Sequence, residues 1–209
     1  MGWRAVSVFI SEREGGVLGA FPAHLPERAG QILSGLGWGV DLESKPSQLD
    51  AGLEPPPGWF CVGAYEGAAL LCGHPELYGI VESPERPLRR RLLSLFPVAQ
   101  VLFWELDEAT NFVAYALYDG GRLLRAVACD PGRGVVLNAG ELQPEEETLL
   151  RAASGTAAPE GGDLTDMAES LLFALTGRFL GSPLNTFQAE RLRVELFRTR
   201  RSWRERLGL

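Results

Sequence analysis

Residues 112–129 of the chain read FVAYALYDGGRLLRAVAC, two runs rich in aliphatic and aromatic residues joined by Asp119, Gly120 and Gly121. Runs of this kind on either side of a Gly-containing turn are typical of a β-hairpin. Both Asp119-Gly120 and Gly120-Gly121 are suitable two-residue loops, and a shift by one residue exchanges the two faces of the hairpin. The stretch therefore predicts an antiparallel pair and leaves open which side faces the core.

More strand-like runs surround this hairpin. Apolar or alternating segments predict strands at residues 3–10, 59–65, 68–72, 98–106 and 134–138. Glu66-Gly67 joins two of them into what we call the first hairpin, residues 59–72, and the runs from 98 to 138 form a meander. Hairpins pair their strands antiparallel and so cannot build a parallel doubly wound sheet. We therefore expect an α+β fold with a mostly antiparallel sheet covered by helices.

Apolar residues at helical spacing predict where those helices lie. The predicted helices cover residues 25–36, 84–96, 145–153 and 163–179. In the second of them, Leu88 and Leu92 belong to the apolar stripe, and Arg89, Arg90 and Arg91 are expected on the exposed face. Residues 41–58 contain four prolines, so we expect a surface loop there.

The C-terminal residues 188–209 are basic, with seven Arg and three Glu, although the whole chain carries a net charge of −7. Apolar residues recur there every three or four positions, which predicts a basic amphipathic helix from 188 to 207. Its apolar stripe needs a cover, because a free helix of about 20 residues is only marginally stable in water. The cover could be the protein's own body, another protein subunit or an anionic membrane surface. The expected contact residues are Leu192, Leu196, Arg200, Arg201, Trp203 and Leu207.

The length of 209 residues suits one large domain or one domain with an appendage. A hydrophobic content of 45% excludes a wholly disordered chain. We expect an α+β domain at residues 1–183, followed by the amphipathic helix as an appendage at 184–209.

Charge and cysteine content narrow the class of protein. The acidic body repels phosphate backbones, so we expect no nucleic-acid partner. No apolar run approaches 18 residues, and no secretory signal follows Met1, so we expect a cytoplasmic protein without a membrane span. The three cysteines include no C-x-x-C pair, which agrees with a reducing compartment.

Few residues offer reactive chemistry. Cys72 and His74 could meet as a thiol and a base, but cysteines in a sheet core and a turn at His74-Pro75 are the more common arrangement. Glu105 at the end of a strand could be a partly buried general acid, but a solvated strand end is more common. With Glu66 in the turn of the first hairpin, these are the candidate catalytic residues. We expect no metal, because a zinc site needs four ligands, and no cofactor, because Gly35-x-Gly37-x-Gly39 lacks the spacing of a dinucleotide loop.

The hairpin motifs resemble a bacterial family of unknown function. The segment from Asn111 contains Tyr115-Ala116 and Gly121-x-Leu123-x-Arg125, and it follows a hairpin with Tyr65-x-Gly67 and the pair Ser83-Pro84. The resemblance covers residues 1–150 and leaves the C-terminal helices outside. It implies an α+β fold and no established activity, so it transfers no functional residue.

Two functions follow from these observations. The first is an uncharacterised protein that acts through protein–protein contacts or self-association of its C-terminal helix, without catalysis; this is favoured because nucleophile, base and anion-binding glycines do not converge. The alternative is a small-molecule enzyme or binder with its site between the first hairpin and the acidic strand end. That alternative requires at least two of the four candidates in one pocket.

Overall fold

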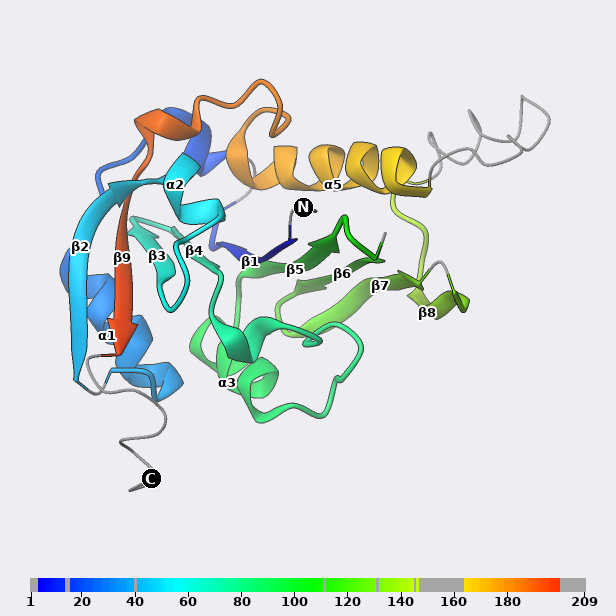
Figure 1. The fold of residues 1–209 in the computed structure, drawn as a ribbon, viewed down its shortest axis with the longest axis horizontal. Coiled ribbons are helices and arrows are strands. Elements are labelled where there is room, and N and C mark those ends of the chain that lie inside the picture. Colours follow the sequence, from blue (N-terminus) through cyan, green and yellow to red (C-terminus); the bar gives the residue numbers. More distant parts are fainter. Residues whose placement is uncertain are drawn as a thin grey trace.

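The computed structural model of the chain describes residues 4–13, 16–39, 41–110, 112–130, 132–144, 146 and 164–199. In chain order the strands are β1 (Arg4–Ser11), β2 (Leu42–Gln48), β3 (Phe60–Tyr65), β4 (Ala68–Cys72), β5 (Gln100–Asp107), β6 (Phe112–Asp119), β7 (Arg122–Asp130), β8 (Gly134–Gly140) and β9 (Arg193–Thr199). The α-helices are α1 (Pro26–Leu36), α2 (Leu49–Leu53), α3 (Pro87–Leu95) and α5 (Leu164–Leu180), with short 3₁₀ turns at Val17–Ala20, Pro75–Leu77 and Ala189–Arg191. The fold is α+β (Figure 1).

All nine strands form one antiparallel sheet in the order β2-β9-β3-β4-β1-β5-β6-β7-β8. The first hairpin is β3–β4, closed at Tyr65 and Ala68, and the strands β5 to β8 follow one another across the sheet. β1 lies between these two groups and joins them through its pairs with β4 and β5.

The β6–β7 hairpin settles the register that the sequence leaves open. Asp119 pairs with Arg122, so the loop consists of Gly120 and Gly121, whose φ angles are 54° and 77°. Both angles lie in the left-handed region, which glycine adopts without a steric penalty. A shift of register between Leu117 and Tyr118 marks a bulge just before the turn.

Each face of the sheet packs against different helices. On one face, α1 and α3 contribute Leu33 and Leu92 to a core with Val8 and Phe103. On the other face, α5 packs Leu175 and Phe179 against residues such as Phe9 and Trp104. Figure 1 shows α5 lying along one side of the sheet and α1 and α3 on the opposite side. No helix in the described part of the chain is long and apolar enough to cross a membrane.

The loop expected at residues 41–58 is wrong for residues 42–53. Residues Leu42–Gln48 form the edge strand β2, which pairs with β9 on one side, and the short helix α2 follows directly. Pro46 misleads the prediction because proline cannot donate to a ladder, but an edge strand tolerates it. The polar sequence LESKPSQ also fits an edge, where side chains and backbone face water.

The C-terminal helix is wrong for Arg193–Thr199, which form β9 between β2 and β3. Leu192, Val194 and Leu196 are all buried, a period of two that a strand needs and that the helical spacing from 192 to 196 conceals. Leu49 N donates to Leu192 O, so this stretch is covered by the protein's own α2. Four further residues of the expected interface, Arg200, Arg201, Trp203 and Leu207, lie outside the described residues, as does the expected helix at 145–153 apart from residue 146.

Candidate functional site: an acidic pocket at the end of β5

The four candidate residues from the sequence lie in different surroundings. Glu66 is exposed in the turn between β3 and β4, where its carboxylate accepts a hydrogen bond of 2.6 Å from Arg13. Cys72 is fully buried opposite Cys61, its neighbour on β3. Of the four residues, Glu105 lines the pocket described below and the other three do not.

His74 has a packing role in the structure. Its ring stacks on Trp38 with centroids 3.6 Å apart, and its Nδ1 accepts a hydrogen bond from Glu76 N. Burial lowers the pKa of His74 to about 4, so the ring is neutral at pH 7. Burial also raises the pKa of the Cys61 thiol well above its ordinary value, which leaves it protonated and unreactive.

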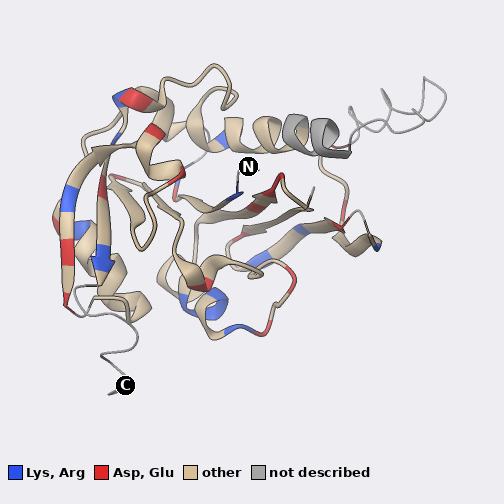
Figure 2. Ribbon diagram, viewed as in Figure 1, with Lys and Arg blue, Asp and Glu red and all other residues tan. Residues whose placement is uncertain are grey.

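The pocket that contains Glu105 has a volume of about 410 Å³. It lies where β1 begins and β5 and β7 end, and the loop of residues 78–82 covers one side. Figure 2 shows acidic residues at this end of β5. The lining residues are Arg4, Tyr78, Gly79, Glu82, Glu105, Asp107, Thr110, Phe112, Asp130 and Arg133.

Glu105 is the buried carboxylate of this pocket, with 3% of its surface exposed. Its Oε2 accepts a hydrogen bond of 2.7 Å from Gly79 N, and its Oε1 accepts one of 3.4 Å from Arg4 Nη2. Burial raises the pKa of Glu105, and these two hydrogen bonds oppose the rise without cancelling it. The solvated strand end that the sequence favours is therefore wrong for Glu105, and its burial agrees with the less common alternative of a partly buried carboxyl group.

Two arginines lie among the acidic residues of the pocket. Arg4 Nε is 3.6 Å from Asp107 Oδ2, and the guanidinium lies 4.2 Å from the centre of the Tyr78 ring. Arg133 is 3.0 Å from Asp130 and 3.7 Å from Glu82. Hydrogen bonds from Arg133 and from backbone N–H groups lower the pKa of Asp130.

The charges around the pocket do not balance. Four carboxylates, from Glu82, Glu105, Asp107 and Asp130, face two guanidinium groups, from Arg4 and Arg133. The lining residues include no cysteine, histidine or serine that could serve as a nucleophile with its base. Within the described residues, no group of three or more His, Cys, Asp or Glu is arranged to hold a metal ion. The arrangement is suited to attracting a cationic group.

A buried arginine on α3 holds the loop that covers the pocket. Arg89 is 4% exposed and donates hydrogen bonds to Ile80 O, to Val81 O at 2.6 Å and to Tyr118 Oη at 2.7 Å. The expected exposed position of Arg89 is therefore wrong. Its side chain lies at the margin of the apolar stripe and reaches polar partners from two other elements, which the helical spacing does not reveal.

Residues 5–197 match the model of a "Family of unknown function (DUF6928)", a stretch that runs from β1 into β9. The match confirms the resemblance to a family of unknown function and extends it beyond residue 150 to include α5 and most of β9. Comparisons with curated proteins and with solved structures each returned no match. The chain thus belongs to DUF6928, a family of unknown function.

Proposed function

We propose that this protein acts through contacts with a partner protein, without catalysis, and that the acidic pocket receives a cationic side chain of that partner. The main observation that supports this proposal is the excess of carboxylates over guanidinium groups around a cavity of about 410 Å³. Clefts lined mainly by one sign of charge raise the local concentration of counter-charged groups. Phe112 adds aromatic surface, which suits the flat guanidinium of arginine or the stem of lysine.

The hydrogen bonds of Glu105 support binding over catalysis. Both of its carboxylate oxygens are engaged, by Gly79 N and by Arg4, so a general acid at this position would first have to lose them. A cytoplasmic location is part of the proposal and is supported by the facing thiols of Cys61 and Cys72, which are not joined in a disulfide.

A small-molecule binder is the second candidate, because the cavity volume falls within the range of small-ligand sites. The two candidates share a cationic group and differ in what carries it. A peptide would also touch the surface around the mouth of the pocket, whereas a free amine or guanidine would affect the lining residues alone.

The test is an NMR titration of the ¹⁵N-labelled protein with Nα-acetyl-arginine amide, Nα-acetyl-lysine amide and ethylguanidine. We expect the backbone amide resonances of Gly79 and of the last residues of β5 to change chemical shift, and these changes should level off as the probe concentration rises. Glu82→Gln and Asp130→Asn should each weaken binding by about fivefold, the value of one screened charge at 4 Å. Glu27→Gln removes an exposed charge on α1 and should change nothing.

Three outcomes separate the candidates. Equal affinity in all the variants would contradict the pocket as the site. Tight binding of ethylguanidine without gain from the amide probes would favour the small-molecule candidate. A gain in affinity when the arginine is placed within a tripeptide would favour the protein partner.

A further inference from the structure

One arginine of the chain itself lies between two carboxylates of the acidic pocket. Arg133 Nε is 3.0 Å from Asp130 Oδ2, and Arg133 Nη2 is 3.7 Å from Glu82 Oε1. Asp130 is the last residue of β7, and Glu82 ends the loop that covers one side of the pocket. The guanidinium of Arg133 therefore bridges two separate parts of the pocket wall.

The three side chains differ in their exposure to solvent. The side chain of Arg133 is 64% exposed, whereas those of Glu82 and Asp130 are 34% and 30% exposed. Within the described residues, Arg133 makes no ring contact and no ion pair beyond these two. The arginine thus lies on the solvent side of two carboxylates that are largely covered.

Other groups than Arg133 hold the two carboxylates in place. Asp130 Oδ1 accepts a hydrogen bond of 2.9 Å from Gly132 N. Glu82 directly follows Val81, whose carbonyl oxygen accepts a hydrogen bond of 2.6 Å from the buried Arg89. Asp130 and Glu82 therefore form a subsite for a cation that does not depend on Arg133 for its geometry.

The second arginine of the pocket is held more firmly. Arg4 lies 3.4 Å from Glu105 and 3.6 Å from Asp107, and its guanidinium is 4.2 Å from the centre of the Tyr78 ring. Arg133 has no such stacking partner, and an exposed ion pair contributes little to stability. Of the two arginines, Arg133 is the one that an incoming cation can replace at little cost.

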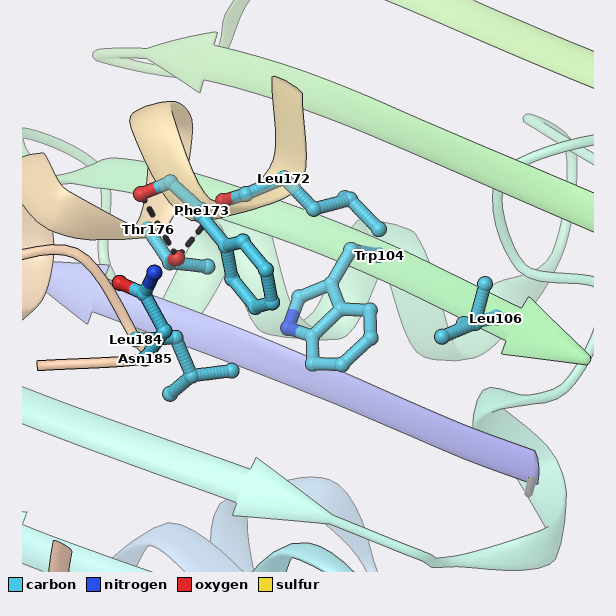
Figure 3. Close-up of a pocket in the computed structure, with 7 residues that line it drawn as sticks. All are labelled: Trp104, Leu106, Leu172, Phe173, Thr176, Leu184 and Asn185. Atoms are coloured by element: carbon cyan, nitrogen blue, oxygen red, sulfur yellow. Dashed lines mark hydrogen bonds between the residues drawn. The ribbon is translucent and has the colours of Figure 1, made fainter. Parts of the chain in front are cut away.

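The sheet closes the pocket from behind. Trp104 and Leu106, the neighbours of Glu105 in β5, point to the opposite face of the sheet, where they meet residues of α5 such as Leu172 (Figure 3). A group that reaches Asp130 and Glu82 therefore comes from the solvent side, where Arg133 lies.

We propose that Arg133 occupies the position of the ligand in the free protein, and that an arginine side chain of the partner displaces it and pairs with Asp130 and Glu82. This inference rests on the proposed function, because it takes the acidic pocket as a cation site. Arg133 reaches the two carboxylates with two nitrogens of one planar group, whereas the ammonium of lysine is a single point charge. The subsite therefore selects arginine over lysine.

The test compares the binding of unlabelled Nα-acetyl-arginine amide to the ¹⁵N-labelled wild type, Arg133→Gln and Arg133→Lys. Arg133→Gln should bind the probe about fivefold more tightly, the value of one screened charge at 4 Å. Arg133→Lys should fall between the wild type and Arg133→Gln, because lysine keeps the charge but loses the second contact of the planar group.

Arg122→Gln is the matched control. It removes the same charge from the first residue of β7, roughly 25 Å from Asp130 along the strand. This separation exceeds the screening length of about 10 Å at 0.1 M salt, so the variant should bind the probe as the wild type does.

The displacement itself can be observed at the Nε–Hε resonance of Arg133, which is assigned by its absence from the spectra of Arg133→Gln and Arg133→Lys. We expect this resonance to move toward the position of a free arginine as the probe saturates the wild type. Nα-acetyl-lysine amide should bind about fivefold more weakly than the arginine probe, as the loss of one net hydrogen bond would give.

Three results would overturn the displacement of Arg133 by arginine. These are equal affinities of the wild type and Arg133→Lys, an Arg133 resonance that does not change at saturation, and equal affinities for the two probes. In each case, weaker binding by Glu82→Gln and Asp130→Asn would still support the acidic pocket as a cation site. If neither the wild type nor Arg133→Gln binds either probe, the proposed function fails together with this inference.

Discussion

The buried ion pair between Arg125 on β7 and Glu146 allows a quantitative test of how two paired buried charges contribute to stability. Both side chains are 6% exposed, and Arg125 Nε lies 3.0 and 2.9 Å from the two carboxylate oxygens. Arg125 Nη1 also donates to Asn138 Oδ1 at 2.6 Å, and Gln143 N donates to Glu146 Oε2 at 2.8 Å. Removing either member leaves the other charge buried without its main partner.

Each single substitution should therefore be costly. We expect Arg125→Met and Glu146→Met each to lower the free energy of unfolding by about 3–5 kcal/mol, the usual cost of stranding a buried charge. The double variant should lose no more than about 2 kcal/mol, because methionine side chains fill the space and no buried charge remains. The remaining loss reflects the hydrogen bonds of Asn138 and Gln143 that the pair now satisfies.

Urea unfolding of the wild type, the two single variants and the double variant measures this coupling directly. Arg133→Met is the control, because its pair with Asp130 is largely exposed and its loss should change the free energy of unfolding little. A double variant that loses the sum of the two single losses would refute the coupling between Arg125 and Glu146.

Three further predictions concern individual side chains. Burial raises the pKa of Glu105 above its unfolded value, so wild-type stability from this group falls as pH rises from about 4.3 toward the raised pKa, and Glu105→Gln should lack that fall in thermal melts from pH 4 to 7. Burial lowers the pKa of His74 from an ordinary 6.5 to about 4, so the stability that the neutral ring contributes to the fold is lost as pH falls from 6.5 to 4. His74→Phe should be about 1 kcal/mol less stable at pH 7, because the hydrogen bond from Glu76 N is lost. Below pH 6.5 the stability of this variant should depend less on pH than that of the wild type. The same pH dependence in both proteins would contradict the buried neutral ring. Leu196→Ala should cost about 2–5 kcal/mol in urea unfolding because Leu196 is 2% exposed, whereas Leu142→Ala, at 49% exposed, should cost little; similar losses would be evidence against β9.

The sequence predicts the elements whose periodicity is unambiguous. The hairpins β3–β4 and β6–β7 combine strand-like runs with glycine turns, and the helices α1, α3 and α5 show an apolar stripe with proline or glycine at an end. These signals are local, so they can be seen without knowing what packs against each segment.

β2 and β9 escape prediction because each depends on the other. β2 is polar and contains Pro46, and it becomes a strand through pairing with β9, about 150 residues later in the chain. At the start of β9 and just before it, the buried positions 192, 194 and 196 also satisfy half of a helical pattern. Neither segment contains a local signal strong enough to reveal the distant partner.

Only part of the candidate site can be predicted from the sequence. Glu105 stands out because alternation places it on the same face as the apolar Phe103 at the end of a strand. Arg4 and Asp130 belong to β1 and β7, which the sheet order places near β5, and Tyr78 lies in the loop after the 3₁₀ turn Pro75–Leu77. That order is not encoded in any single motif.

The position of β9 between β2 and β3 has a consequence for synthesis on the ribosome. Glu43 on β2 bonds to Arg198 on β9 at 2.8 Å, although 155 residues separate them. At translation rates of about 5–20 residues per second, β9 is synthesised roughly 8–30 s after β2. The charges of Glu43 and Lys45 and the missing N–H of Pro46 discourage pairing between nascent chains during that interval. The features that conceal β2 in the sequence thus protect it while the sheet is incomplete.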